Sequence, residues 1–163
     1  MSKSIQLIVA AAENRVIGRA GRLPFDIPED KEWFHDRTAN QVVVLGRICF
    51  ETWPRVQLEG RKPVVITRNR ALASDTVRVA ANVTEALSIA QELPGEIMVC
   101  GGQRIYEETL PLADRLLLTL VHANVEGDTY FPEWRQLAWT ETWRKGGHDA
   151  KYAYTFSILE RVP

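Results

Sequence analysis

Residues 16–34 read V-I-G-R-A-G-R-L-P-F-D-I-P-E-D-K-E-W-F, from Val16 to Phe34, and lead from a glycine-rich loop into a short helix. Asp26 and Glu29 have the spacing of a capping box. Pro28 falls in the first helical turn, where its missing N–H costs nothing. The sequence therefore predicts that a helix begins at this point, and we place the chemistry of the protein here.

Asp30 is a carboxylate on the apolar face of that helix. Side chains three and four positions apart share a helix face, so Asp30 is in line with Trp33 and Phe34. Burial without a neighbouring cation disfavours the charged form of an acid, and we expect the pKa of Asp30 to be raised. The alternative is a structural role, in which Asp30 bonds to backbone at the helix start or pairs with an arginine from elsewhere.

The length of 163 residues fits one domain, 1–163, with a sizeable core. A net charge of −1 offers no broad electrostatic surface for nucleic acid or an anionic membrane. Cys49 and Cys100 lie beside or within apolar segments, form no C-x-x-C pair and follow no signal peptide, so we expect a reduced cytoplasmic protein. The three histidines are scattered and indicate no metal site. No apolar run approaches the roughly 20 residues that span a bilayer.

Strands and helices alternate along most of the chain. Strands are predicted at Ile5–Ala12, Gln41–Leu45, Pro63–Thr67, Val77–Ala80, Glu96–Cys100 and Arg115–Val121, and helices at residues 48–53, from Asn82 to Gln91, and from Gln103 to Leu110. Trp139–Trp143 and the alternating residues of Tyr152–Ile158 predict antiparallel strands joined by a turn near Gly146-Gly147. This order predicts the α/β class, as a three-layer α/β/α domain whose mixed, mostly parallel central sheet is closed by a C-terminal antiparallel hairpin.

Two glycine turns are candidates for phosphate binding. Gly46-Arg47 and Gly101-Gly102-Gln103-Arg104 each follow a strand and open a helix, which supplies backbone N–H groups, a positive helix end and a cation. Neither is a G-x-G-x-x-G or Walker sequence, and such glycines often only make tight turns. Two turns at the ends of neighbouring strands nevertheless favour a dinucleotide, because open α/β sheets bind ligands at the carboxyl ends of their strands.

Thr67-Arg68 leaves the strand P-V-V-I-T and is a candidate for a further anion contact. Arginine suits a 2′-phosphate because its planar fork offers several donors. Arg70 competes for this assignment, and an exposed surface arginine is the alternative for both.

Arg61, in the segment E-G-R-K, has two interpretations. It is either a clamp for a substrate carboxylate or an arginine that only decorates a loop. Trp53 and Leu58, earlier in the chain, are either walls of a pocket or ordinary core residues.

Taken in order, these motifs resemble dihydrofolate reductase over nearly the whole chain. They are V-I-G with L-P-F-D-I-P-E-D and W-F, then G-R-x-x-F-E, L-x-G-R-K, I-M-V-C-G-G-Q-R-I-Y, L-T, E-G-D-T-Y-F-P and F-S-I-L-E-R. The resemblance implies an enzyme that moves hydride from NADPH to C6 of dihydrofolate while N5 takes a proton. The product is tetrahydrofolate, which supplies one-carbon metabolism.

On this resemblance, Asp30 matches the family's single pocket acid, which bonds to the 2-amino and N3 side of the pterin and favours N5 protonation. Thr119 matches the residue that bonds to this acid, and Arg61 matches the arginine that grips the α-carboxylate of the glutamate tail. The implied catalytic positions are Asp30, Thr119 and Phe25. The implied substrate pocket contains Ile8, Val9, Asp30, Lys31, Phe34, Trp53, Leu58, Arg61, Cys100, Tyr106 and Thr119.

The resemblance also implies a cofactor site. Ala10, Ile17 and Gly18 would lie near the nicotinamide and its ribose, with Cys100 and Tyr106 on the same side. Arg47, Ile48 and Cys49 would meet the phosphates, and Thr67 and Arg68 would lie towards the 2′-phosphate. The remaining implied cofactor-binding residues are Arg22, Leu23, Gly46, Gly101, Gly102, Gln103, Arg104 and Ile105. Gly101-Gly102 matches a pair that the family joins by a cis peptide, which is costly for non-proline residues. Asp128 matches a residue that helps hold the active-site loop closed.

Three positions depart from the family pattern. Phe25 replaces a tryptophan whose indole N–H helps order active-site water, and phenylalanine cannot donate that bond. Lys31 replaces an aliphatic or aromatic residue that faces the aminobenzoyl group, and Cys49 replaces a threonine near the phosphates. These departures bear on substrate choice.

Two other functions stay open at this stage. One is a reductase of another pterin or of a pyrimidine, and the other is a non-catalytic nucleotide-binding module that kept the fold. If the chain is a dihydrofolate reductase, the expected small-molecule partners are dihydrofolate and antifolate inhibitors of the trimethoprim type. We expect no nucleic-acid or membrane partner and a monomer.

Overall fold

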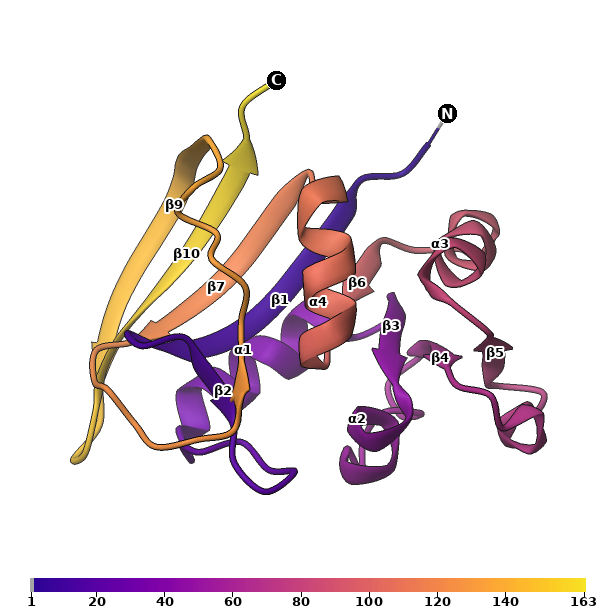
Figure 1. The fold of residues 1–163 in the computed structure, drawn as a ribbon, viewed down its shortest axis with the longest axis horizontal. Helices are drawn as coiled ribbons and strands as arrows, with labels where there is room; N and C mark the ends of the chain where they lie inside the picture. The colour runs from indigo at the N-terminus through magenta and orange to yellow at the C-terminus, as the bar shows by residue number, and fades with distance from the viewer. Residues whose placement is uncertain (1) are drawn as a thin grey trace.

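An eight-stranded sheet forms the centre of the computed structural model, which describes residues 2–163. The strand order is β5-β4-β3-β6-β1-β7-β10-β9 (Figure 1). The strands are β1 (Ile5–Ala12), β3 (Val42–Gly46), β4 (Lys62–Ile66), β5 (Arg78–Ala80), β6 (Ile97–Val99), β7 (Arg115–Val121), β9 (Trp139–His148) and β10 (Ala153–Arg161). All neighbours from β5 to β7 pair in parallel, and β10 and β9 are antiparallel. The predicted α/β class with a mostly parallel sheet and a C-terminal antiparallel pair is confirmed.

Helices cover both faces of this sheet. They are α1 (Pro28–Thr38), α2 (Arg47–Thr52), α3 (Val83–Glu92) and α4 (Gln103–Thr109), with 3-10 turns at Arg70–Leu72 and Leu110–Leu112. Apolar residues of α3 and α4 pack with one set of strand side chains, and those of α1 and α2 pack with the other set. On β1, Leu7 belongs to the first set and Ile8 to the second, as alternation along a strand requires. The three predicted layers are therefore present.

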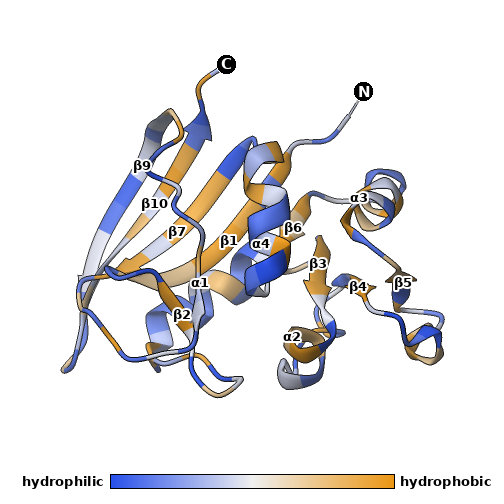
Figure 2. Cartoon of the chain, in the orientation of Figure 1, coloured by the Kyte–Doolittle hydropathy of each residue, from blue (hydrophilic) through white to orange (hydrophobic). Residues whose placement is uncertain are grey.

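The parallel strands are buried on both faces, and this accounts for their continuous apolar sequences. Residues 42–45 of β3 have no exposed area. Figure 2 shows β1, β3 and β6 as hydrophobic strands in the middle of the sheet and a more hydrophilic β9 at its edge. Within residues 2–163, no helix is both long enough and apolar enough to cross a bilayer.

The helix α1 begins at Pro28 as predicted, but the predicted capping box is wrong. Its N-cap is Ile27, and no side chain caps the helix start. The Asp26 carboxylate instead pairs with Lys31 Nζ at 2.5 Å. Glu29 accepts a hydrogen bond from the Tyr154 hydroxyl at 2.8 Å, so the strand β10 competes successfully for the carboxylate that a capping box needs.

The predicted turn near Gly146-Gly147 is also wrong, because both glycines lie inside β9. Gly147 is paired with Tyr154. A Cβ on Gly147 would lie 2.5 Å from the Tyr154 ring, so this glycine permits a close approach and does not make a turn. The turn is built by Asp149, whose carboxylate accepts from the backbone N–H groups of Lys151 and Tyr152.

A second, two-stranded sheet lies beside the first. It pairs β2 (Val16–Gly18) with β8 (Thr129–Tyr130) in antiparallel fashion. In Figure 1 this pair lies near the ends of α1 and α4. The loop that follows β2 is therefore held close to the carboxyl ends of the central strands, where open α/β sheets bind ligands.

Candidate active site

A cavity of about 1340 Å³ opens where β1, β3 and β6 end, between α1, α2, α4 and the loop after β2. It exceeds the roughly 300 to 1,000 Å³ of an ordinary ligand pocket. The predicted site residues that line it are Ile8, Val9, Ala10, Ile17, Gly18, Arg22, Leu23, Asp30, Lys31, Phe34, Gly46, Arg47, Ile48, Cys49, Trp53, Cys100, Gly101, Gly102, Gln103, Arg104, Ile105, Tyr106 and Thr119. The volume is enough for two ligands side by side.

Asp30 is the buried acid of this cavity, with 6% of its surface exposed. Burial raises the pKa of Asp30 to about 6, and a hydrogen bond from the Thr119 side chain opposes part of that rise. No charged partner among residues 2–163 contributes to this pKa. The expected rise for a desolvated carboxyl without a cation is confirmed, and the proposed arginine pair is not found in this part of the chain.

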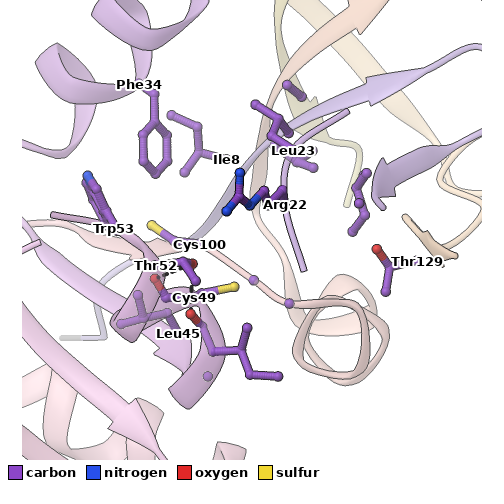
Figure 3. A pocket seen from close by; sticks show the side chains of 18 of the residues that line it. Ile8, Arg22, Leu23, Phe34, Leu45, Cys49, Thr52, Trp53, Cys100 and Thr129 are labelled. Atoms are coloured by element: carbon purple, nitrogen blue, oxygen red, sulfur yellow. Dashed lines mark hydrogen bonds between the residues drawn. The ribbon is translucent and has the colours of Figure 1, made fainter. Parts of the chain in front are cut away.

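Sheet pairing fixes the position of Thr119 relative to the strand β1. Thr119 on β7 pairs with Ala10 on β1, and the next inward position of β1 is Ile8. Elsewhere in the cavity lining, the Phe34 and Trp53 rings pack together, with their centres 4.7 Å apart. Figure 3 shows Ile8, Phe34 and Trp53 around the same space. One end of the cavity is thus an apolar slot with a single acid in it.

The two glycine turns meet at the other end of the cavity. The Gly46 N–H donates to the Gly101 carbonyl at 2.9 Å, which joins the carboxyl ends of β3 and β6. The predicted cis peptide between Gly101 and Gly102 is confirmed. A Cβ on Gly101 would lie 3.2 Å from the Tyr106 ring, so a side chain has little room there. Since α2 and α4 have no side-chain cap, their first backbone N–H groups are free to face a ligand.

Asp128 holds the loop after β2 over this cavity. Its carboxylate accepts from the Ala20 N–H at 2.9 Å, and its own N–H donates to the Gly18 carbonyl at 2.9 Å. The neighbouring Tyr130 N–H donates to the Gln103 side chain at 2.8 Å, which ties the same segment to α4. The predicted contact between Asp128 and the loop is present.

The two thiols in the cavity are poor nucleophiles. Burial raises the pKa of both Cys49 and Cys100, and the effect on Cys100 is large. A thiol whose pKa is raised has little nucleophilic thiolate at neutral pH. Figure 3 shows both side chains at the cavity wall, with Cys100 next to Trp53.

A sequence model of the family described as dihydrofolate reductase matches residues 4–161. The chain belongs to the dihydrofolate reductase family. It is 39% identical over 161 residues to a dihydrofolate reductase type 3 from Salmonella typhimurium, with 96% of this chain and 98% of that protein covered. It is 35% identical over 162 residues to a dihydrofolate reductase from Buchnera aphidicola subsp. Acyrthosiphon pisum, with 97% and 99% covered.

A solved dihydrofolate reductase from Enterococcus faecalis, complexed with NADP(H) and RAB-propyl, has the same fold. It superimposes on this chain with a TM-score of 0.84 and 31% sequence identity, over 97% of this chain and 96% of that one. The architecture of this family member is therefore shared with a relative that was solved in complex with NADP(H).

Five predicted site residues of this dihydrofolate reductase family member do not line the cavity. Phe25 is buried against Tyr152, with ring centres 6.0 Å apart. Leu58 is 54% exposed, and Arg61 is buried behind the cavity wall. Thr67 and Arg68 lie beyond the end of β4, where the Thr67 hydroxyl accepts from the Asn69 N–H.

Several lining residues were missed from the sequence. They are Gly21, Trp33, His35, Leu45, Thr52, Pro54, Arg55 and Thr129. His35 gives no signal because it follows Phe34 on the exposed side of the helix pattern. Arg55 lies in an irregular segment after α2, where no periodicity indicates direction.

Proposed function

We propose that this chain reduces 7,8-dihydrofolate to 5,6,7,8-tetrahydrofolate with NADPH, as members of its family do. One observation carries the proposal: the cavity joins a buried carboxyl, Asp30, to two glycine turns that open helices. The first feature suits a protonatable heterocycle and the second suits a pyrophosphate. The family match and the NADP(H) complex of the Enterococcus faecalis relative support the same assignment.

The residues present fit NADPH. Gly46 and Gly102 precede the two helices without a side chain that would cover the free N–H groups, and Arg47 and Arg104 line the cavity beside them. Ala10, Ile17 and Tyr106 would surround the nicotinamide, and Thr67 and Arg68 would meet the 2′-phosphate from outside the cavity lining. When bound, NADPH supplies the hydride that C6 of the substrate receives.

Asp30 would hold the 2-amino and N3 side of the pterin and favour protonation of N5. A group with a pKa of about 6 exchanges protons readily near neutral pH. Thr119 orients the carboxyl, and the apolar walls formed by Ile8 and Phe34 exclude bulk water from it. The loop held by Asp128 would admit the water that carries the proton to N5.

The acid also makes antifolate binding a consequence of the proposal. A protonated diaminopyrimidine would place its charge against the Asp30 carboxylate and supply the cationic partner that this buried acid lacks within residues 2–163. We further propose that the protein acts as a monomer in the cytoplasm.

NADPH oxidation by the purified protein tests the function. Turnover should be faster with low concentrations of dihydrofolate than with a dihydropterin that lacks the aminobenzoylglutamate tail. Preference for the bare pterin would assign the enzyme to another pterin substrate. Absence of oxidation with both compounds, together with retained NADPH binding, would favour a nucleotide-binding module.

A further inference from the structure

Arg61 lies one aromatic ring away from the candidate active site. Its side chain has no exposed area, and its guanidinium carbon lies 5.1 Å from the centre of the Trp53 ring, which lines the cavity. Nε donates to Thr38 Oγ1 at 2.9 Å, and one Nη2 N–H donates to the His35 carbonyl at 2.8 Å. These bonds fix the orientation of the guanidinium.

The other terminal nitrogen of Arg61 meets a carboxylate from its own loop. Nη1 donates to the carbonyls of Arg55 and Leu58, each at 3.1 Å, and forms an ion pair with Glu59. The second carboxylate oxygen of Glu59 accepts from Arg55 Nε at 2.8 Å. Hydrogen bonds from Arg55 and Arg61 hold the pKa of Glu59 below its usual range, so the bridge is ionised at neutral pH.

Arg55 depends on Glu59 for its position. Its Nη1 lies 2.9 Å from His35 Nδ1, and the Trp53 Nε1–H donates to His35 Nε2 at 3.2 Å. A neutral imidazole accepts at only one of its two nitrogens, whereas arginine and indole can only donate. His35 therefore cannot satisfy both neighbours, and the Glu59 carboxylate is the group that keeps Arg55 in place.

Glu59 holds this bridge from an uncommon backbone conformation. Its φ is 55°, in the left-handed region that residues other than glycine rarely adopt. About a third of its side chain is exposed, so the carboxylate has a path to water. Two guanidiniums and one carboxylate leave a net positive charge at this end of the cavity, where Arg55 and His35 form part of the lining.

We propose that Glu59 is a specificity-determining residue, whose carboxylate competes with the glutamate-tail carboxylates of the substrate for Arg61 and Arg55. The inference rests on the proposed function. A tail carboxylate reaches the outer edge of Arg61 only when Glu59 turns to solvent, because the other hydrogen bonds of that guanidinium are to the Thr38 hydroxyl and to backbone carbonyls. A substrate without a tail meets no such competition.

This competition reduces the difference in binding between dihydrofolate, which carries a glutamate tail, and a pterin without a tail. Replacing the Glu59 carboxylate by a substrate carboxylate changes the free energy little, because one ion pair with the guanidinium is broken when the other forms. Without the Glu59 charge, Arg61 and Arg55 lose the carboxylate with which both form ion pairs. The substrate tail then supplies a carboxylate without displacing a protein group.

Steady-state kinetics of Glu59→Gln test the proposal. We expect the KM for dihydrofolate to fall about threefold to tenfold with kcat unchanged, the range expected for a partly exposed ion pair to arginine. The KM for a tail-free dihydropterin should stay the same. Glu141→Gln is the matched control, because it removes the same charge from β9, at the opposite edge of the sheet.

A KM for dihydrofolate that does not fall, or that falls equally for the tail-free dihydropterin, would overturn the role of Glu59. If Glu59→Gln does not fold, Glu59→Asp withdraws the carboxylate from Arg61 while keeping its charge, and the same selective fall in KM is expected to a smaller degree. An unsubstituted protein that oxidises no NADPH with dihydrofolate would overturn the proposed function itself. The two failures are distinguished by which protein shows them.

Discussion

The Asp30 carboxyl on the first turn of α1 meets the Thr119 hydroxyl on β7, and burial outweighs this hydrogen bond in setting the pKa of the acid at about 6. Thr119 is fixed from both sides, because it pairs with Ala10 of β1 and with Phe156 of β10. A rigid strand therefore presents the hydroxyl to an acid that has lost its water. With a pKa of about 6, the Asp30 carboxyl can take up and release a proton near neutral pH.

Replacement of Asp30 by asparagine should abolish most turnover and leave NADPH affinity unchanged. The amide keeps the shape of the carboxyl but cannot take or release a proton, and such general acid or base groups contribute about 100-fold or more to a rate. The remaining activity should rise as the pH falls, because only substrate protonated in solution can then react. Asp26→Asn, at an exposed carboxylate four residues earlier, is the control. Equal turnover by Asp30→Asn at neutral pH would refute the role of the acid.

The same substitution should stabilise the protein at neutral pH. The pKa of Asp30 rises from 3.8 to about 6 on folding, so between these values the folded state binds more protons than the unfolded state. Stability is therefore lost as the pH rises through this window, by up to about 3 kcal/mol. Denaturant unfolding at pH about 7 and about 4 should show Asp30→Asn more stable than the original protein only at the higher pH. A difference that is the same at both pH values would contradict the burial of an unpaired charge.

The position of Asp30 was predictable because helical spacing alone placed an acid between apolar residues. The capping box was not, because its failure depends on a tertiary contact. Glu29 bonds to Tyr154, a residue far along the chain, and no local pattern around Pro28 indicates that competition. Local signals therefore located the start of the helix correctly while misassigning one of its side chains.

The parallel strands were predictable within one or two residues from their continuous apolar sequences. The loop that carries Arg55, Glu59 and Arg61 was not. Glu59 and Arg55 lie in an irregular loop, and their pairing with Arg61 depends on a left-handed residue and on backbone carbonyls that have no sequence signature. The sequence left Arg61 open between a carboxylate clamp and a loop arginine, and it gave no sign that the Glu59 carboxylate pairs with this guanidinium.

Loss of the Asp128 carboxylate should loosen the loop over the cavity. Asp128→Ala removes the acceptor of the Ala20 N–H, and an exposed hydrogen bond of this kind contributes about 0.5 to 1.5 kcal/mol. We expect faster amide hydrogen exchange at Ala20 and turnover reduced several-fold, with global stability nearly unchanged. Glu126→Gln, which removes only a surface pair with Arg19, should change neither quantity. Unchanged exchange at Ala20 in Asp128→Ala would show that this bond does not hold the loop.

The two adjacent glycines of β9 should respond oppositely to alanine. A Cβ on Gly147 would lie 2.5 Å from the Tyr154 ring and 2.8 Å from the Glu29 carboxylate, whereas a Cβ on Gly146 meets nothing within 4 Å. Gly147→Ala should lower the free energy of unfolding by about 1 to 3 kcal/mol, and Gly146→Ala should leave it unchanged or raise it by up to about 1 kcal/mol.

Because Glu29 precedes Asp30 on α1, displacement of its partner Tyr154 should also disturb the acid, and Gly147→Ala should raise the KM for dihydrofolate while Gly146→Ala does not. Chemical denaturation and steady-state kinetics of the pair measure both effects. Equal stabilities of the two variants would mean that the close contact between β9 and β10 relaxes without cost. If Gly147→Ala loses stability without a change in KM, the contact between β9 and β10 does not affect the active site.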